Sequence, residues 1–340
     1  MLTDSAKKKP TLSQIADSLG VSIATVSKVV NGKPDISTET RQKVEGALLK
    51  SGYRKTSKTN HPQYIEIVFQ KLDSLWEIEI LRGLEDAANK NGLSVIVTVN
   101  GNKLHPASDW VDGVIRRNPI GVILVFSSLM PNETHKLRSR NIPYTILDPS
   151  GDPSPESMSV HADNWTGGLI ATRHLISLGH KRIAIITGPT DMMCSKARLD
   201  GYQAALEEAG IPIDDSLVKI GNFDETEGLA QGKALLQMEN PPTAIFAGSD
   251  RQAMGVFEAA RQLNVKIPEN LSVVGFDDVQ TAAYMNPSLT TVRQPLRDMA
   301  AQALQMILDA KQGKADAEKS IIFPTSLITR SSTAALEEKN

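Results

Sequence analysis

The segment Thr11–Asn31, TLSQIADSLGVSIATVSKVVN, has the pattern of two short helices joined by a tight turn. Apolar residues recur at helical spacing in its first half, and Thr11 can cap that helix through its hydroxyl. Gly20 supplies a backbone position that is free to turn. Ser22 can cap the second helix, which we expect over Ile23–Val30 with its valines turned inward. The pattern predicts a helix-turn-helix, whose second helix lies in the major groove of DNA.

An ordinary helical hairpin would show the same spacing, so the pattern alone leaves both alternatives open. The particular residues favour the DNA-binding one. The string TLSQIADSLGVSIATVSKVVNG, with ISTETRQKVEGALLKSGY after it, resembles the headpiece of the LacI/GalR family of bacterial transcription regulators. The shared residues are the runs GVS, TVS and NG, then S-x-x-TR and GY. A third helix, expected from Ser37 or Thr38 to about Lys50, would close the headpiece core.

The resemblance also implies how the headpiece contacts an operator. Ile23, Ala24 and Lys28 would meet base edges, where a long basic side chain can reach G O6/N7 and the apolar ones a thymine methyl. The residues that would contact phosphates are Thr11, Ser22, Thr25, Ser27, Asn31, Ser37, Thr40 and Tyr53. Hydroxyl and amide groups at such positions fix the register of the protein on the duplex.

Charge is divided unevenly along the 340 residues. Residues 1–60 hold eleven Lys and Arg against five Asp and Glu, whereas the remaining 280 residues hold 26 against 34. The basic end suits a polyphosphate partner, because neutralised phosphates release counterions. A basic but merely solvated surface is the alternative, and its coincidence with the helix-turn-helix favours DNA.

The rest of the chain alternates strands and helices. The expected strands are 64–69, 93–99, 121–126, 144–147, 182–187, 217–220, 243–247, 271–276, 319–323 and 326–329. The expected helices are 75–90, 107–117, 132–140, 166–178, 197–209, 226–237, 252–263 and 296–310. This rhythm is typical of α/β folds with parallel sheets covered by helices on both faces. Two such halves in tandem predict two lobes with a cleft between them, and the last segments are expected to cross back between the lobes.

The resemblance extends over this region, through GHKRIAIITGP, PTAIFAGSD, LSVVGFDD and LTTVRQP. It implies a headpiece followed by a two-lobed core like that of periplasmic sugar-binding proteins. We expect a headpiece at 1–55, a linker at 56–63 and an effector-binding and dimerisation core at 64–330. The N-lobe would hold about 64–163 and 293–324, and the C-lobe about 164–292 and 325–330.

The sequence shows no arrangement typical of an enzyme or a metal site. It contains no GxxxxGK[ST], HExxH or GxSxG motif and no GxGxxG after a strand, and its six histidines are scattered. We therefore expect a protein that is not an enzyme and needs no metal or other cofactor. A single cysteine, Cys194, and the lack of a secretory signal or long apolar run predict a cytoplasmic protein that does not enter a membrane.

Several polar residues follow predicted strands, where ligands bind in parallel α/β folds. By resemblance Arg198 and Asp277 would clamp an effector, Phe223 would stack on it, and Ser74 and Trp76 would close over it. Asp148 and Ser249 are further candidates at strand ends. Each also has an ordinary alternative: a strand-end Asp can cap a helix, Arg198 can form a surface ion pair, and Trp76 can belong to the core. Asp250 and Asp278 are interpreted as helix caps.

Together these features predict a homodimeric regulator, a repressor of sugar-utilisation genes, that binds double-stranded operator DNA and responds to a small sugar. The string VFQKLDSLWEIEILRGLE is similar to that of members linked to plant-polysaccharide sugars. The alternatives are a regulator that responds to a purine or a phosphoprotein, and a sugar-binding module without a regulatory role. The tail STAALEEKN lacks the apolar heptads of a coiled coil, which argues against a tetramer.

The linker departs from the family pattern. Family members usually carry a hinge helix here, whose leucine wedges into the minor groove. In this chain Pro62 stands about where the leucine is expected, and proline disfavours helix in the residue before it. We therefore predict that residues 54–63 act as a flexible basic arm on DNA; a short helix held by the partner chain is the alternative.

Overall fold

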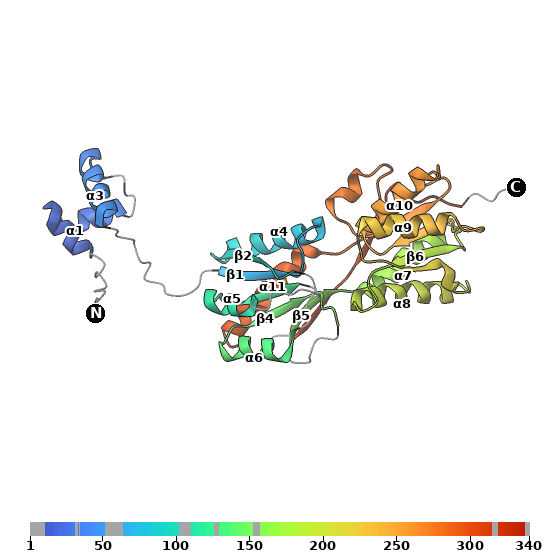
Figure 1. The fold of residues 1–340 in the computed structure, drawn as a ribbon, viewed down its shortest axis with the longest axis horizontal. Helices are drawn as coiled ribbons and strands as arrows, with labels where there is room; N and C mark the ends of the chain where they lie inside the picture. Colours follow the sequence, from blue (N-terminus) through green and yellow to red (C-terminus); the bar gives the residue numbers. More distant parts are fainter. Residues whose placement is uncertain are drawn as a thin grey trace, which may run out of the picture. The chain divides into compact units, whose positions relative to one another are not determined.

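The computed structural model describes residues 11–30, 33, 35–51, 64–101, 110–125, 129–151, 157–314 and 319–336. The chain divides into two units, Met1–His61 and Pro62–Asn340 (Figure 1). Asn31, Tyr53 and the predicted linker lie outside the described residues, so the linker predictions stay predictions. The relevant architecture is therefore a small helical unit and, separately, a two-lobed α/β unit.

The first unit is a three-helix headpiece, made of α1 (Leu12–Leu19), α2 (Ile23–Val30) and α3 (Thr38–Ser51). Its core gathers Ile15, Ala16, Val26, Val29 and Val44. The predicted local signals are confirmed. The Gln14 N–H donates to the Thr11 hydroxyl at 3.3 Å, and Gly20 ends α1 in the left-handed region with φ of 64°.

The N-lobe contains a six-stranded sheet in the order β11-β5-β4-β3-β1-β2, in which all neighbours are parallel. Its elements are β1 (Tyr64–Phe69), α4 (Leu75–Lys90), β2 (Ser94–Val99), α5 (Trp110–Arg117), β3 (Val122–Val125), α6 (Pro131–Ser139), β4 (Tyr144–Leu147), β5 (Met158–Ala162), α11 (Leu296–Lys311) and β11 (Ser320–Phe323). Helices α4 and α11 pack against one sheet face through a buried apolar cluster. Helices α5 and α6 supply a second cluster on the sheet.

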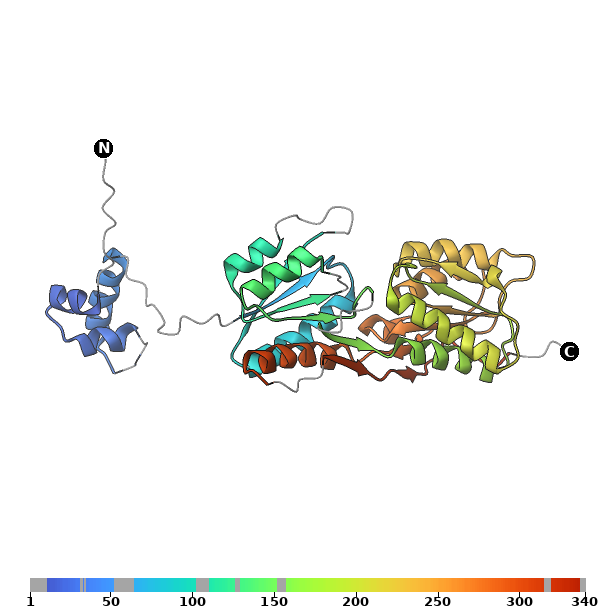
Figure 2. The ribbon, with the colours of Figure 1, turned by 90° about the horizontal axis from the view of Figure 1, so that it is seen from below.

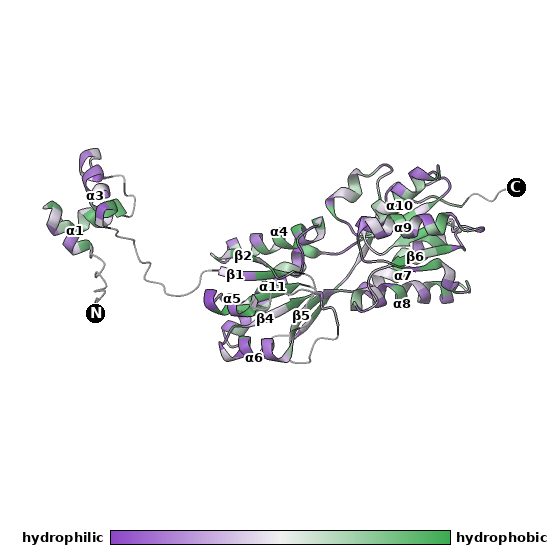
Figure 3. Cartoon of the chain, in the orientation of Figure 1, coloured by the Kyte–Doolittle hydropathy of each residue, from purple (hydrophilic) through white to green (hydrophobic). Residues whose placement is uncertain are grey.

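The C-lobe repeats the arrangement with the order β12-β10-β9-β8-β6-β7. Its elements are α7 (Asn164–Ser177), β6 (Ile183–Thr187), α8 (Met193–Glu208), η1 (Asp215–Leu217), β7 (Val218–Ile220), α9 (Glu225–Leu236), β8 (Ala244–Ala247), α10 (Asp250–Gln262), β9 (Ser272–Asp277), η2 (Gln280–Tyr284), β10 (Thr290–Arg293) and β12 (Ser326–Ile328). Only the pair β10–β12 is antiparallel among the described strand pairs. Figure 3 shows apolar residues on strands such as β6, with polar residues on the outer sides of α6 and α8.

The final strands tie the lobes together, as expected from the sequence. Strand β11 pairs with β5 in the N-lobe, and β12, which follows after two residues, pairs with β10 in the C-lobe. Figure 2 shows these last strands running from one lobe to the other. The chain also crosses between β5 and α7 and between β10 and α11. The expected set of strands was incomplete, because β5 and β10 were not predicted.

Candidate functional site

The exposed side of α2 carries the residues predicted to read bases. Ile23 is 51% exposed, and Ala24 and Lys28 are exposed as well, whereas Val26 and Val29 face the core. Ile23 is not among the apolar side chains that pack in the headpiece core. The structure thus brings Ile23, Ala24 and Lys28 to one solvent-facing surface of the headpiece.

Several hydroxyls predicted to contact phosphates also cap helices. The Thr25 N–H donates to the Ser22 hydroxyl at 3.1 Å, and the Thr40 N–H donates to the Ser37 hydroxyl at 3.3 Å. Thr11 caps α1 in the same way, and Ser27 lies half-buried on α2. Thr11, Ser22 and Ser37 are thus held at helix N-termini, where free N–H groups favour anions, whereas Ser27 lies inside α2.

Lys28 has a partner that the sequence did not reveal. Its Nζ donates to Asp35 Oδ2 at 2.6 Å, and both side chains are about half exposed, at 50% and 55%. The hydrogen bond from Lys28 lowers the pKa of Asp35, so this carboxylate stays ionised. A base contact through Lys28 therefore requires this ion pair to loosen.

Between the two lobes lies a cavity of about 690 Å³. Of the predicted effector residues, those that line it are Ser74, Trp76, Arg198, Phe223, Ser249 and Asp277. Asp148 is not among the lining residues: it is buried next to Arg198, with Oδ2 unpartnered among the described groups. Its direct contact with an effector stays a prediction.

Arg198 lies at the inner end of this cavity and is only 4% exposed. Its Nε donates to Asn164 Oδ1 at 2.9 Å, and one terminal nitrogen donates to the Gly248 carbonyl at 2.5 Å. The ring of Phe276 lies under the guanidinium, and the Phe223 ring is 5.3 Å away. The surface ion pair considered for Arg198 is therefore wrong, since its group is buried and fixed from several sides.

Asp277 lies opposite this cation and accepts a 2.7 Å hydrogen bond from Gln294 Nε2. Burial raises the pKa of Asp277 to about 7, against the attraction of Arg198. Burial likewise raises the pKa of Asp148 to about 6. The guanidinium of Arg198 thus lies near two carboxyl groups, Asp277 in the cavity lining and the buried Asp148, whose pKa values are raised toward neutral pH.

The aromatic wall is built by a strained loop. Phe223 has φ of 69°, and its ring rests where a side chain at Gly188 would stand. The Ser249 hydroxyl donates to the Phe223 carbonyl at 3.0 Å and also accepts the Gln252 N–H, so Ser249 caps α10. Ser249 therefore fixes the loop that presents Phe223, besides lining the cavity.

The N-lobe wall comes from the start of α4. The main-chain N–H of Ser74 donates to the Glu77 carboxylate at 3.0 Å, which holds the first turn of this helix. Trp76 is 7% exposed, belongs to the N-lobe core and also lines the cavity, so both alternatives for this residue apply.

Two residues interpreted as caps have other roles. Asp250 accepts the Val279 N–H at 2.9 Å and the Thr291 hydroxyl at 2.5 Å, so it joins three segments of the C-lobe. Asp278 forms ion pairs with Arg293 and Arg330 instead of capping a helix. The cap interpretation fails because it considered only the following turn, whereas these carboxylates reach residues distant in the sequence.

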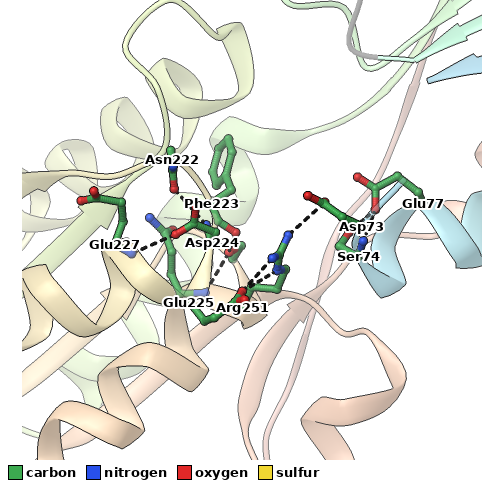
Figure 4. Close-up of polar contacts among 11 residues, drawn as sticks. Asp73, Ser74, Glu77, Asn222, Phe223, Asp224, Glu225, Glu227 and Arg251 are labelled. Carbon is green, nitrogen blue, oxygen red and sulfur yellow. Dashed lines mark hydrogen bonds and ion pairs between the residues drawn. The ribbon is translucent and has the colours of Figure 1, made fainter. Parts of the chain in front are cut away.

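The sequence analysis also missed part of the cavity lining. Asp73, Asn222, Glu225 and Arg251 stand at its outer side, on the loop after β1 and at the starts of α9 and α10 (Figure 4). Position just after a strand could have pointed to Asn222, which follows β7, and the same rule covers Asp73. Arg251 lies inside a helix, and no local pattern marks it.

Comparisons with known proteins agree with both units. Residues 11–55 match the family described as "Bacterial regulatory proteins, lacI family", and residues 172–333 match "Periplasmic binding protein-like domain". The HTH-type transcriptional repressor CytR of Escherichia coli strain K12 is 32% identical, over 97% of this chain and 99% of CytR. The chain belongs to the LacI family of bacterial regulatory proteins. The HTH-type transcriptional regulator DegA of Bacillus subtilis strain 168 is 31% identical, over 96% of this chain and 99% of DegA.

Solved structures of this family share the fold. The CelR–cellobiose complex is 29% identical, with a TM-score of 0.73, over 95% of this chain and 99% of CelR. The Lac repressor dimer bound to operator and the anti-inducer ONPF is 26% identical, with a TM-score of 0.77, over 96% of this chain and 100% of that one. This LacI-family chain is accordingly a DNA-binding transcription regulator. None of the helices in the described ranges is long and apolar enough to cross a membrane.

Proposed function

We propose that this LacI-family chain is a homodimeric repressor whose affinity for operator DNA changes when a small neutral sugar binds in the interlobe cavity. The observation that carries the proposal is the combination of Arg198, Asp277 and the Phe223 ring at one end of that cavity. Charged donors and acceptors each make paired hydrogen bonds to hydroxyls, and an aromatic face packs on the apolar side of a sugar ring. The protein acts by binding rather than by catalysis, in the cytoplasm, where the chromosome lies.

The charge of the cavity supports a neutral effector over a phosphorylated one. Its lining carboxyl residues are Asp73, Glu77, Asp191, Asp224, Glu225 and Asp277, and its lining cations are Lys71, Arg198 and Arg251. Arg251 is paired with two carboxylates, and Arg198 is engaged by carbonyl oxygens. A phosphate group in the cavity would face a surplus of carboxyl groups, which favours a neutral sugar over a sugar phosphate. CelR, solved with cellobiose, and a LacI-family regulator from Enterococcus faecium, solved with bound ribose, bind sugars in a similar fold.

The residues of both sites remain proposals. We propose that the exposed face of α2 reads the operator through Ile23, Ala24 and Lys28, that the capping hydroxyls contact phosphates, and that Asn31 and Tyr53 do so from outside the described residues. In the cavity, Ser74, Trp76, Phe223 and Ser249 would surround the sugar. Asp148 would act through Arg198, since it is buried beside that cation.

A thermal-shift screen of the full chain tests the effector class. Monosaccharides, disaccharides, sugar phosphates and purine nucleosides are compared. A true effector at a hundredfold excess over its Kd adds about 2.7 kcal/mol to the stability of the folded protein. Stabilisation by neutral saccharides alone supports the proposal, whereas stabilisation only by purines or phosphates rejects the sugar. An electrophoretic shift with operator, with and without the stabilising compound, then tests regulation and distinguishes a pure sugar-binding module.

A further inference from the structure

An ion-pair chain crosses the outer side of the cavity from one lobe to the other. Arg251, the second residue of α10 in the C-lobe, donates to Asp73 Oδ1 in the N-lobe at 3.3 Å. The same guanidinium holds Glu225, the first residue of α9, through two nitrogens at 2.8 Å. All three residues line the cavity, and Figure 4 shows Arg251 reaching from the α9–α10 side toward Asp73.

The residues at both ends of this series of ion pairs are supported by neighbouring contacts. On the N-lobe side, Asp73 directly precedes Ser74, whose main-chain N–H is held by Glu77 at the start of α4. On the C-lobe side, Nε and a terminal nitrogen of Arg251 both contact the single oxygen Oε2 of Glu225, and these two contacts orient the planar guanidinium better than one contact could. The guanidinium of Arg251 and the main chain next to Asp73 are therefore held before the two side chains meet, and this lowers the entropy lost when the partly exposed ion pair forms.

The C-lobe end is also connected to the aromatic wall. Glu225 lies two residues after Phe223, and the Phe223 carbonyl accepts the hydroxyl of Ser249, two residues before Arg251. The Phe223 loop is therefore connected to Glu225 along the chain and, through Ser249, to the start of α10, which carries Arg251. Apart from the strands that cross between the lobes, the Met193 N–H to Ser150 carbonyl contact at 3.1 Å is another link between them.

We propose that Arg251 is a positioning residue that clasps the two lobes together by pairing with Asp73 while Glu225 ties it to the Phe223 loop. The clasp favours the closed cleft. Because a sugar that contacts both lobes binds the closed cleft best, the clasp raises effector affinity and sets how strongly occupancy is transmitted to the rest of the chain. The claim that the clasp affects effector binding and its transmission to the rest of the chain rests on the proposed function. The claim that Arg251 and Asp73 hold the two lobes together does not.

Lobe separation in the full chain, without any effector, tests the clasp directly. Nitroxides are placed at exposed Arg140 in the N-lobe and exposed Glu239 in the C-lobe, and labelled subunits are diluted with unlabelled ones so that distances within one chain are measured. Arg251→Met and Asp73→Asn are each expected to shift the distance distribution toward longer values, and the double variant no further. Arg261→Gln is the matched control, because Arg261 lies on the same helix and its ion-pair partner among the described residues is Glu258 of that helix. A wild-type distribution in either Arg251→Met or Asp73→Asn overturns the clasp.

Binding of cellobiose, used as the probe, gives the second readout. Each single variant is expected to weaken binding about two- to fivefold, the range of a partly exposed ion pair, and the double variant by no more than either. Additive losses mean that each residue contacts the sugar by itself, and they overturn the clasp. If the wild-type chain binds neither cellobiose nor any saccharide of the screen, the proposed sugar effector fails, while the distance measurement still decides on the clasp.

Discussion

Arg198 lies over the ring of Phe276, with its guanidinium carbon 3.7 Å from the centre of the ring. The stack and the two hydrogen bonds to Asn164 and Gly248 fix the plane of the cation before any effector arrives. A lysine could carry the charge but not the planar fork or the stack. A contact within the C-lobe thus orients Arg198 in the proposed effector site.

Arg198→Lys is expected to raise the effector Kd by about tenfold or more, equivalent to about 1.4 kcal/mol, while operator binding by the free protein is retained. Isothermal titration with the best saccharide of the screen measures the first quantity, and an electrophoretic shift measures the second. Arg173→Lys, at a surface ion pair with Glu208, is the matched control. Normal effector affinity in Arg198→Lys would leave this residue with a structural role only.

Asp277 predicts a pH dependence of stability. Its pKa is about 7 in the folded chain, against an ordinary value near 3.8, so the folded state keeps a proton that the unfolded chain has lost between these values. Unfolding then releases a proton, and rising pH through this window destabilises the fold. Asp277→Asn removes this contribution and also relieves the buried Asp250, whose pKa is raised by burial and by the charge of Asp277, whereas Asp148, with a pKa of about 6, still acts in the same direction.

The Tm difference between Asp277→Asn and wild type is therefore expected to grow in favour of the variant from pH 5 to pH 8. Differential scanning fluorimetry in matched buffers measures it. Histidines such as His180, whose pKa is lowered by burial, affect both proteins alike and cancel in the difference. A difference that is constant with pH contradicts the assignment of a raised pKa to this carboxyl.

The close packing at Gly168 leads us to expect that one substitution lowers both the stability of the fold and the affinity for the effector. A Cβ at this position of α7 would collide with the main-chain carbonyl of Arg198 on α8. Gly168→Ala must therefore push the two helices apart, at a cost of about 1–3 kcal/mol, and displace Arg198. We expect both a lower Tm and a weaker effector. Gly46→Ala is the matched control, because its helix position has open space and the change should stabilise by about 0.5–1 kcal/mol.

Substitutions of Lys28 and Asp35 are expected to change DNA binding in two different ways. Lys28→Ala should weaken operator binding by about 1–3 kcal/mol and relax the preference at one base pair. Asp35→Asn should strengthen binding to operator and to unrelated DNA alike, by up to a few fold, because no ion pair has to be broken. Quantitative shifts on operator and base-substituted fragments measure both. Lys43→Ala, at an exposed ion pair of α3, serves as the control, and unchanged base preference in Lys28→Ala would rule out base readout by this lysine.

The linker carries a prediction from sequence alone. A basic arm at 54–63 without an apolar wedge should bend the operator less than the tens of degrees that wedges produce. A bending assay with the site permuted along the fragment measures the angle. A sharp central kink would favour an ordered hinge helix instead.

The sequence by itself was enough to predict the helix-turn-helix headpiece and the alternation of strands and helices in the core. Thr11, Gly20 and Ser22 act through caps and turns that close within a few residues, so their roles could be predicted locally and are confirmed. The apolar runs marked most strands in the same way. Strand β5, with the sequence MSVHA, escaped because it lacks such a run, and its place in the sheet depends on pairing with β4 and β11.

Only the tertiary structure decided the details of the cleft. Parallel strands end at a common edge, which is why Asp277 and Ser249 could be expected there, but the sequence did not show that Asp148 is almost fully buried and absent from the cavity lining. The stack of Arg198 on Phe276 and the ion pair of Arg251 with Asp73, 178 residues apart, leave no trace in local sequence. The physical reason is that such contacts depend on how helices and lobes pack against one another, and that packing is set by the whole apolar core rather than by neighbours in the chain.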